Sequence, residues 1–185
     1  VQVYCDVVTD NGGWIIFQRR QDGSEDFFRG WDDYVSGFGK LDGEFWLGLD
    51  TIHNLTKTNQ YKLRVDLEDF DGNKTFATYR YLDKTLQWVR CIINGTSDCK
   101  PTGADSKLAV AYKFTTKDRD QDERDGGNCA IVYKGAWWYR SCHSANLNGL
   151  YLRGAHESYA DGVNWRFWRG YHYSLKVTEM KLKLK

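Results

Sequence analysis

Apolar and polar residues alternate with period two in several short stretches, a pattern typical of strands with one buried face. Two β-type runs, at 1–4 and 14–17, flank a turn at 10–13 whose Asn and Gly residues accept positive φ, which predicts a β-hairpin. The alternation over 61–67 predicts a half-buried strand, and the β pattern continues over 74–81.

The C-terminal residues also alternate, but the parity of the apolar positions changes once. Before position 178 the apolar residues stand at odd-numbered positions, and after position 179 they stand at even-numbered positions. A bulge near Thr178 and Glu179 would keep both sets on the buried face of one strand, so we expect a bulge there. The same alternation predicts that Lys181, Lys183 and Lys185 face water, and it explains these lysines more simply than a heparin-binding tail does.

Helical spacing occurs in two short stretches. Apolar residues over 27–38 predict a short helix, which Gly37 and Gly39 are suited to end. A second short helix is expected over 50–56, entered through an Asp or Thr cap. From position 115 onward regular periodicity fades into Gly-rich loops, where binding residues concentrate.

The composition narrows the possible partners. The 185 residues are most simply one domain, and 26 Lys plus Arg against 25 Asp plus Glu leave no net field that would attract nucleic acid or an anionic membrane. No apolar run is long enough to span a membrane. Recognition is therefore expected at a local site, with no nucleic-acid partner and no membrane insertion by this chain.

Cysteines and glycosylation sequons indicate the compartment. The five cysteines form no paired Cys-x-x-Cys metal signature, and their separations suit small disulfide loops. Sequons begin at Asn54, Asn73 and Asn94, in polar sequence where a glycan could project. These features favour a secreted or extracellular protein, or the ectodomain of a membrane protein, and a start at Val1 without an apolar signal region is typical of a mature or trimmed fragment.

Carboxylates are concentrated in the loop that begins at residue 118. Asp118, Asp120 and Asp122 alternate with other polar residues, and such oxygen ligands would suit calcium. An EF-hand loop is excluded, because Glu123 and Cys129 stand where its Gly and bidentate Glu would be required. Spacing alone does not choose between a calcium loop and a solvated acidic loop.

Sequence markers distributed along nearly all of the chain identify a family. They are Tyr4-Cys5-Asp6, Asn11-Gly12-Gly13-Trp14, Phe45-Trp46-Leu47-Gly48-Leu49-Asp50, the loop from Asp118, Asn128-Cys129-Ala130, Gly135-Ala136-Trp137-Trp138-Tyr139, Cys142-His143, Asn146-Leu147-Asn148-Gly149 and Asn164-Trp165. With these markers the chain resembles the fibrinogen C-terminal-like domain, the module of ficolins, tachylectins, angiopoietins, tenascins and the fibrinogen chains. It is most similar to the acetyl-binding lectins of the ficolin and tachylectin type.

The resemblance implies an α+β fold with three parts. A small N-terminal subdomain would span roughly 1–44. A central twisted, mostly antiparallel sheet would span 45–107 and receive the C-terminal strand from 172–185. A loop-rich subdomain over 108–171 would carry the calcium and ligand sites.

The resemblance also implies metal and disulfide sites. Calcium would be bound by the carboxylates of Asp120 and Asp122 and by the backbone carbonyls of Arg124 and Gly126. Cys129 would pair with Cys142, and the usual partner of Cys5 would lie upstream of Val1. A second bridge is expected between Cys91 and Cys99, in a segment that departs from the family pattern and where a short loop is within feasible reach.

The ligand site implied by the resemblance is an acetyl pocket. Its residues would be Tyr133, Cys142, His143, Tyr159, Ala160 and Tyr171. The three tyrosines would form a slot for the methyl group, and a cis peptide at Cys142-His143 would turn backbone N–H groups toward the ligand. Any one of these residues taken alone is more simply a packed tyrosine or a satisfied core histidine.

Three function classes follow from this sequence. The first is a calcium-dependent, lectin-like pattern-recognition module of innate immunity, which binds acetylated glycans such as N-acetylglucosamine and N-acetylgalactosamine on microbial or host surfaces and is homo-oligomeric at full length. The alternative is a protein–protein module, either a growth-factor-like receptor ligand or a fibrinogen-type assembly unit, although Tyr133 and Ala160 stand where fibrinogen's hole needs carboxylates. An enzyme is not expected, because the side chains of Cys142 and His143 diverge and no hydrolase elbow or phosphate loop occurs.

Overall fold

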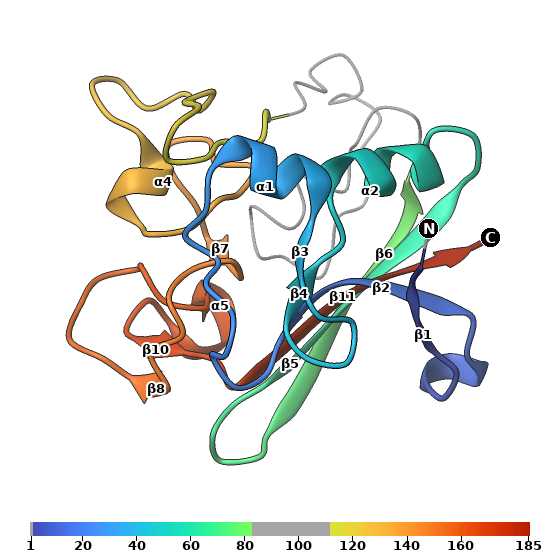
Figure 1. Cartoon of the computed structure of the whole chain (residues 1–185). Helices are drawn as coiled ribbons and strands as arrows, with labels where there is room; N and C mark the ends of the chain where they lie inside the picture. The colour runs from blue at the N-terminus through green and yellow to red at the C-terminus, as the bar shows by residue number, and fades with distance from the viewer. Residues whose placement is uncertain (1, 83–111) are drawn as a thin grey trace, which may run out of the picture.

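The computed structural model describes residues 2–82 and 112–185. The expected disulfide Cys91–Cys99 and the sequon at Asn94 lie outside these residues. Within them, a central sheet carries two helices near one end, and the C-terminal half of the chain forms a lobe of short elements beside it (Figure 1).

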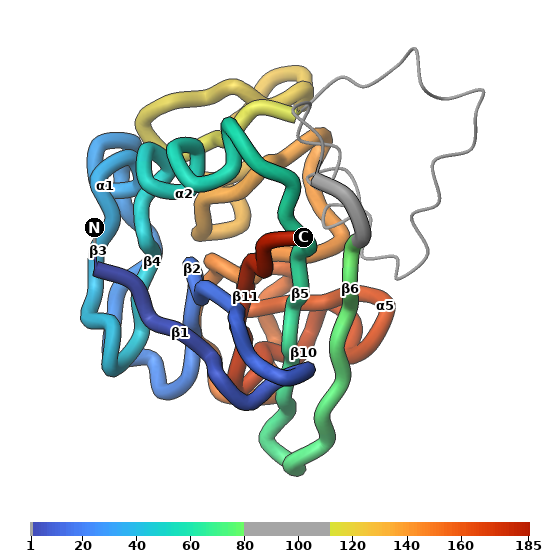
Figure 2. Tube along the Cα trace, turned by 90° about the vertical axis from the view of Figure 1, so that its right-hand side faces the viewer, coloured from blue at the N-terminus to red at the C-terminus, as the bar shows by residue number. Residues whose placement is uncertain are grey.

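The central sheet has seven strands, and all of its pairings are antiparallel. Its order is β3 (Phe38–Gly39), β4 (Phe45–Trp46), β2 (Trp14–Arg20), β11 (Val177–Leu184), β5 (Tyr61–Glu68) and β6 (Lys74–Leu82), with β1 (Tyr4–Asp6) paired to β2. The C-terminal strand thus lies between β2 and β5, as the red ribbon in Figure 1 and the tube in Figure 2 show. The predicted α+β fold is confirmed, while the three subdomain boundaries stay a prediction.

The N-terminal hairpin is confirmed. Strands β1 and β2 pair antiparallel and are joined through a single turn of 3-10 helix at Thr9–Asn11. Asp10 and Asn11 have φ of 46° and 65°, in the left-handed region that the predicted turn requires. Cys5 lies on β1, where it is exposed and free of any disulfide.

Both expected helices are present, with different ends. Helix α1 (Trp31–Ser36) is shorter than the 27–38 stretch, because the flanking apolar residues of that stretch pack on each other outside the helix. Helix α2 (Leu49–Thr56) matches its expected span, but the expected Asp or Thr cap is wrong. Gly48 occupies the N-cap at φ 100°, since a Cβ there would lie 2.8 Å from the Ser36 carbonyl carbon.

The C-terminal strand contradicts two expectations. The pairing of β11 with β5 is regular, so β11 itself has no bulge. In its pairing with β2, Met180 lies opposite Gln18 but the next residue, Lys181, lies opposite Ile16. One β2 residue is therefore skipped, and the bulge lies on β2. Lys181 is buried rather than solvated, because β11 is an interior strand. Its ammonium group lies 2.7 Å from the carboxylates of Asp6 and Asp66. The other two lysines are less buried, and Lys185 is exposed.

The C-terminal lobe is built from short elements linked by buried polar side chains. Its elements are α4 (Cys129–Val132), β7 (Ala145–Asn146) paired with β9 (Asn164–Trp165), β8 (Gly154–Ala155) paired with β10 (Tyr173–Ser174), and α5 (Arg166–Arg169). Asn146 Oδ1 accepts from the Tyr139 hydroxyl at 2.6 Å. Arg20 Nη1 donates from the central sheet to the Gly149 carbonyl at 2.7 Å. These satisfied buried bonds hold the loops against the sheet.

An aromatic core joins the sheet, helix α1 and the lobe. The ring of Trp46 lies 5.4 Å from that of Tyr34 and 5.8 Å from that of Phe114, and Phe114 lies 4.9 Å from Trp138. Both Trp137 and Trp138 are buried, which agrees with the expectation that at least one of this consecutive pair belongs to the core.

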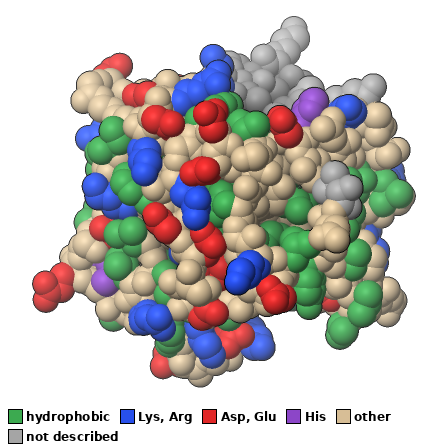
Figure 3. Space-filling model, viewed as in Figure 1, with side chains coloured by type: hydrophobic (Ala, Val, Ile, Leu, Met, Phe, Trp, Pro, Cys, Tyr) green, Lys and Arg blue, Asp and Glu red, His purple; other side chains and the backbone are tan. Residues whose placement is uncertain are grey.

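The surface fits the balanced composition of the chain. On the face drawn in Figure 3, acidic and basic side chains are interspersed without a large field of one sign. None of the helices in the described residues has both the length and the apolar character needed to cross a membrane.

Candidate functional site

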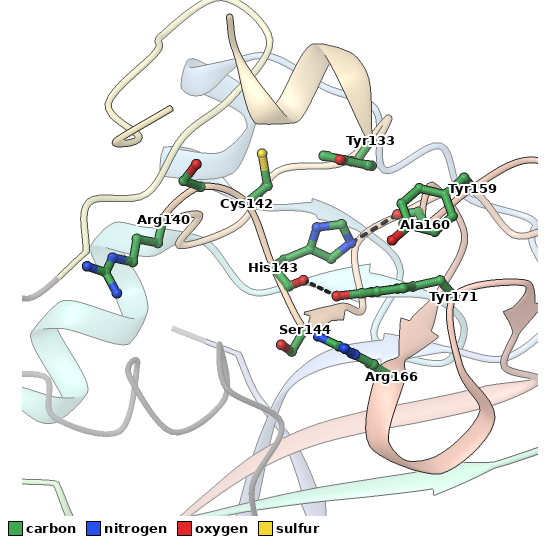
Figure 4. A pocket seen from close by; sticks show the side chains of 10 residues that line it. Tyr133, Arg140, Cys142, His143, Ser144, Tyr159, Ala160, Arg166 and Tyr171 are labelled. Atoms are coloured by element: carbon green, nitrogen blue, oxygen red, sulfur yellow. Dashed lines mark hydrogen bonds between the residues drawn. The ribbon is translucent and has the colours of Figure 1, made fainter. Parts of the chain in front are cut away.

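A pocket of about 340 Å³ opens in the C-terminal lobe (Figure 4). Four parts of the chain supply its lining. They are the residue after α4, the segment 140–144, the loop that precedes β9, and the start of helix α5 together with the second residue after that helix. These ten residues are Tyr133, Arg140, Ser141, Cys142, His143, Ser144, Tyr159, Ala160, Arg166 and Tyr171. All six residues expected for an acetyl site are therefore brought together around one pocket.

His143 is fixed at the centre of this pocket as a neutral donor. Its Nε2 lies 2.9 Å from the Ala160 carbonyl oxygen, and because a carbonyl only accepts, this nitrogen carries the proton. Burial lowers the pKa of His143 to about 4, and the hydrogen bond to Ala160 offsets only part of that shift. The imidazole is therefore uncharged at neutral pH.

Tyrosine rings surround His143 and define an aromatic slot. The ring of Tyr133 lies 4.7 Å from the imidazole, and that of Tyr171 lies 5.8 Å from it. Tyr159 lies 5.2 Å from Tyr171 and is 58% exposed, so its ring forms the outer wall. Ala160 is buried at φ 61°, where its N–H donates to the Tyr171 carbonyl at 3.1 Å. The small Ala160 side chain leaves room beside the rings.

Backbone donors complete the pocket wall. Among the described residues, nothing accepts a hydrogen bond from the backbone N–H of Cys142 or of His143. The Tyr171 hydroxyl donates to the His143 carbonyl at 2.6 Å, which fixes this segment from the opposite side. The cis peptide joins Ser141 to Cys142, one residue before the expected Cys142-His143 bond, so that expectation is corrected.

The predicted disulfide Cys129–Cys142 is confirmed, with Cα atoms 5.7 Å apart. It joins the start of helix α4 to the pocket segment. The backbone N–H of Cys129 also donates to Asp122 Oδ2 at 2.8 Å. The acidic loop is thereby connected to the pocket through a hydrogen bond and a covalent bridge, and the Glu123 N–H also donates to the Arg140 carbonyl at 2.8 Å.

Asp120 and Asp122 suit a cation, and Asp118 has a different role. Asp122 Oδ1 accepts from the Arg124 N–H at 2.9 Å, and Asp120 Oδ1 accepts from the Asp122 N–H at 3.2 Å. Burial and the adjacent Asp120 carboxylate raise the pKa of Asp122, although the N–H groups of Cys129 and Arg124 act in the opposite direction. A bound cation would relieve this repulsion. Asp118 instead accepts from the Trp31 N–H at the start of α1.

The donor set fits a weak calcium site. Among the described residues, the carbonyls of Arg124 and Gly126 accept no hydrogen bond, so both stay available as ligands. No three His, Cys, Asp or Glu side chains in residues 2–82 and 112–185 converge in a way that could hold a metal. The site would thus combine two carboxylates with backbone oxygens, the hard ligands that calcium accepts.

Four pocket residues were missed by sequence reasoning. They are Arg140, Ser141, Ser144 and Arg166. Arg140 and Ser141 directly precede the Cys142-His143 marker, and Arg166 directly follows the Asn164-Trp165 marker. Their proximity to those markers was the only available signal, because none of the four is part of the motifs.

Two sequons lie within the described residues. Asn54 is exposed on helix α2, where its Oδ1 accepts from the Lys57 ammonium at 2.7 Å. Asn73 is exposed at the tip of the β5–β6 hairpin and donates through Nδ2 to Asp69 Oδ2 at 3.0 Å. Both residues are exposed, and their glycosylation stays a prediction.

Residues 1–185 match the protein family described as fibrinogen beta and gamma chains, C-terminal globular domain. The chain belongs to this family. Fibrinogen C domain-containing protein 1 of Macaca fascicularis is 55% identical over 187 residues, which cover 98% of this chain and 43% of that protein. Microfibril-associated glycoprotein 4 of Bos taurus is 50% identical over 189 residues, which cover 99% of this chain and 74% of that protein.

Solved structures agree with this assignment. The fibrinogen-like globe domain of human ANGPTL2 has a TM-score of 0.79 and 40% identity, covering 98% of this chain and 85% of that one. Lamprey fibrin D-dimer, complexed with the peptide Gly-His-Arg-Pro-amide, has a TM-score of 0.77 and 33% identity, covering 98% of this chain and 64% of that one.

The family assignment settles the broad function class. This domain is a non-enzymatic binding module, which confirms the expectation that the chain is not an enzyme, and domains of the family typically bind calcium. The chain spans 43% of the length of the Macaca relative, so the activity of a longer protein stays a proposal. The relatives named above are neither ficolins nor tachylectins, so the finer likeness to those lectins stays a prediction.

Proposed function

We propose that this chain is an extracellular, calcium-dependent, lectin-like domain that binds the acetyl group of N-acetylated carbohydrates. The observation that carries the proposal is the convergence of Tyr133, Cys142, His143, Tyr159, Ala160 and Tyr171 on one pocket. These six residues come from four separate segments of the chain, and the sequence predicts all six as ligand residues. The likeness to ficolin and tachylectin lectins rests on the same six positions.

The pocket chemistry matches an acetyl group. A methyl group would pack against the rings of Tyr159 and Tyr171, which contact each other with centroids 5.2 Å apart beside the small Ala160. The acetyl oxygen would accept from the open backbone N–H groups of Cys142 and His143. His143 positions this wall through its bond to Ala160 and, being neutral, adds no charge that would favour an ionic ligand at the acetyl position.

Calcium would act on the pocket indirectly. When bound, it would neutralise the repulsion between Asp120 and Asp122 and hold the loop in one conformation. That loop contacts the pocket through the Cys129 N–H and the bridge to Cys142. Binding of sugar would therefore depend on calcium without a direct bond between the metal and the ligand.

The extracellular setting and the partners belong to the same proposal. The Cys129–Cys142 disulfide and the exposed sequons fit an oxidising compartment, and the name of the bovine relative identifies it as a glycoprotein associated with microfibrils. A small pocket binding an acetyl group is expected to have a monovalent Kd near 1 mM, about −4 kcal/mol. Useful avidity on microbial or host glycans would then need several copies in a homo-oligomeric full-length protein.

A protein-binding function is the alternative, and the lamprey fibrin complex with a short peptide gives it a structural example. The Gly-His-Arg-Pro peptide of that complex carries an arginine. The pocket of this chain has two arginines and no Asp or Glu in its lining, so it would repel a cationic peptide. Receptor binding through another surface would leave this pocket free.

A competition experiment tests the proposed function. The domain is bound to immobilised N-acetylglucosamine with calcium present, and free N-acetylglucosamine, sodium acetate, glucose and Gly-His-Arg-Pro-amide are added in turn. We expect N-acetylglucosamine and acetate to displace the domain and glucose and the peptide to have no effect. Equal displacement by glucose, or displacement by the peptide alone, would refute the acetyl site.

A further inference from the structure

An aspartate followed directly by a glycine is a place where a protein chain can modify itself without an enzyme. The glycine nitrogen attacks Cγ of the aspartate, because glycine has no Cβ to block the approach. The reaction needs a free glycine N–H, a free carboxyl group and room for the backbone to rearrange. This chain has five such sites, which begin at Asp22, Asp42, Asp71, Asp125 and Asp161.

Hydrogen bonds hold the glycine nitrogen at three of these five Asp-Gly sites. The bonds run from Gly23 to Glu44 Oε1 at 3.0 Å, from Gly43 to the Lys40 carbonyl at 2.9 Å, and from Gly72 to the Asp69 carbonyl at 3.3 Å. A nitrogen whose N–H is held by an acceptor is kept from turning toward the carboxyl group that precedes it.

The site at Asp161 is blocked by packing. Asp161 Oδ1 accepts from the Ser158 hydroxyl at 2.7 Å, so the carboxyl group is not free. Gly162 is buried, and a Cβ there would lie 2.9 Å from His156 Nε2. The backbone at this site therefore has no room to rearrange.

Asp125-Gly126 meets all three requirements. Both residues are exposed, and among the described residues nothing forms a hydrogen bond with the Asp125 carboxyl group or with the Gly126 N–H. Gly126 has φ 73°, and apart from its chain neighbours no described atom lies within 4 Å of the place where its Cβ would be. This site belongs to the acidic loop before α4, which extends to the edge of the molecule (Figure 1).

The chemistry is a rearrangement with no net change in composition. The Gly126 nitrogen bonds to Asp125 Cγ, the C–O bond of the carboxyl group breaks, and the oxygen leaves as water with the amide proton and one proton from solvent. Water then adds to the main-chain carbonyl carbon of Asp125 in the cyclic imide and breaks the bond from that carbon to the Gly126 nitrogen, and one proton returns to solvent. The main chain now runs through Cβ and Cγ, so residue 125 has become isoaspartate.

Isoaspartate would change the spacing of the expected backbone ligands for calcium. The carbonyls of Arg124 and Gly126 lie on either side of Asp125 in the chain. The rearrangement lengthens the main chain between them by one bond of about 1.5 Å, whereas calcium–oxygen distances vary over only about 0.3 Å. When bound to both carbonyls, calcium would in turn fix the backbone around Asp125 and keep Cγ away from the Gly126 nitrogen.

We propose that Asp125-Gly126 is a spontaneous modification site, at which the calcium-free domain converts aspartate to isoaspartate and thereby loses its calcium site. This inference rests on the calcium binding included in the proposed function and adds a chemical fate for the same loop. Calcium protects the site from modification. A domain that stays without calcium gradually loses the ability to bind it again.

Ageing of the intact domain at physiological temperature tests the inference, with calcium in one sample and a chelator in the other. Peptide mapping with fragmentation that distinguishes isoaspartate from aspartate follows each Asp-Gly site separately, because the mass of the peptide does not change. In chelator we expect isoaspartate at residue 125 before any other Asp-Gly site. About 10 mM calcium should slow its formation roughly tenfold or more, since only the calcium-free fraction reacts and the expected Kd is on the order of 10⁻⁴–10⁻³ M.

Calorimetric melts of the aged samples measure the consequence. The rise in Tm that calcium produces in fresh protein should shrink in proportion to the fraction of molecules modified at residue 125. Protein aged with calcium should keep the full rise.

Variants assign the chemistry to Asp125. Asp125→Glu keeps the charge and should stay unmodified, because the longer side chain does not form the five-membered imide ring. Asp125→Asn should age faster than the wild type, since its amide loses ammonia more readily than the carboxyl group loses water, and fresh protein of both variants should keep the calcium increment. Asp71→Glu is the matched control, because it changes an exposed Asp-Gly site whose Gly72 N–H is already bonded and should leave ageing at residue 125 unchanged.

The outcomes separate this inference from the proposed function. If isoaspartate forms first at another Asp-Gly site, or not at all at residue 125, the modification site is refuted and calcium binding stands. If residue 125 is modified equally fast with and without calcium, or if modified protein keeps the full calcium increment, the inference is also refuted. If fresh, unmodified protein shows no calcium increment, the proposed calcium site itself fails, and this measurement before ageing distinguishes the two failures.

Discussion

Tyr159 forms the outer wall of the methyl slot, so its removal should abolish binding without unfolding the domain. We predict that Tyr159→Ala lowers affinity for N-acetylglucosamine at least tenfold, because the slot loses one ring face. Stability should change by less than about 1 kcal/mol, since the side chain is 58% exposed. Phe76→Ala, which removes a similarly exposed ring on strand β6, is the control, and normal sugar binding by Tyr159→Ala would contradict the slot.

His143 should make the stability of the domain depend on pH. Its folded pKa of about 4 lies below the ordinary value of 6.5, so the unfolded chain binds more protons between these values. We predict that stability falls as the pH decreases from 6.5 toward 4, by on the order of 2 kcal/mol from this residue.

The measurement is urea denaturation across that pH range, compared with His143→Gln. Glutamine does not titrate, and its amide retains a donor for the Ala160 carbonyl. The difference in unfolding free energy between wild type and variant should narrow as the pH falls. A constant difference would show that His143 does not titrate in this window.

Some residues at this site could be selected from sequence and others could not. The tyrosines, His143 and Ala160 occupy positions that acetyl-binding relatives use, so resemblance was enough to name them. Resemblance predicted a cis bond one residue too late, and its position at Ser141-Cys142 has no local signal, because the second residue is not proline. Arg166 was missed because it stands outside the motifs and enters the pocket only when α5 packs beside Ser144.

At the scale of elements, strand β11 depends on a buried charge cluster. Lys181 is 2% exposed and lies 2.7 Å from both Asp6 and Asp66 and 3.1 Å from Glu179, which come from three strands. We predict that Lys181→Met destabilises the domain by about 3 kcal/mol, because it leaves these carboxylates without their shared cation.

Denaturant titration measures this effect, with Lys183→Met as the control. Lys183 is two residues along the same strand, and within residues 2–82 and 112–185 its ammonium group donates to one backbone carbonyl, at 3.0 Å, and to no carboxylate. The control should cost less than about 1 kcal/mol. A similar small loss for Lys181→Met would mean that the cluster contributes no net stability.

The elements also show where sequence patterns are informative. Period-two alternation predicted β5 well, because one of its faces is buried along its whole length. The same alternation wrongly predicted that Lys181 faces water. Alternation cannot show that a strand is interior or that its polar face is covered as well. The bulge was placed on the wrong strand, since a register shift is a property of the pair and not of β11 alone.

At the scale of the whole molecule, calcium should stabilise the fold. With two carboxylate ligands, a Kd on the order of 10⁻⁴–10⁻³ M is expected. At about 10 mM calcium, mass action then adds roughly 1–3 kcal/mol to the unfolding free energy, which raises Tm by several degrees.

Calorimetric melts with calcium and with a chelator measure this increment. Asp120→Asn and Asp122→Asn should each remove it, because each deletes one of the two charged ligands. Asp125→Asn is the control, since this exposed residue lies in the same loop and makes no side-chain hydrogen bond among the described residues. An increment that survives in both ligand variants would place calcium elsewhere.

The fold of the whole molecule was predictable through family resemblance, and much less so from local pattern. The markers identified a central sheet that receives the C-terminal strand, which the pairing of β11 with β2 and β5 confirms. Local pattern could not have done so, because those partners lie more than 100 residues away in the chain. The lobe around the pocket has little regular structure, so its packing depends on buried polar bonds that have no sequence period.

A crystal structure of the domain bound to N-acetylglucosamine in calcium tests the central claim most directly. We predict that the acetyl methyl packs against the rings of Tyr159 and Tyr171 and that the acetyl oxygen lies within hydrogen-bond distance of the Cys142 and His143 backbone nitrogens. We also predict calcium on Asp120 and Asp122, separate from the sugar. A sugar bound outside this pocket, or one whose acetyl group points to solvent, would refute the acetyl site.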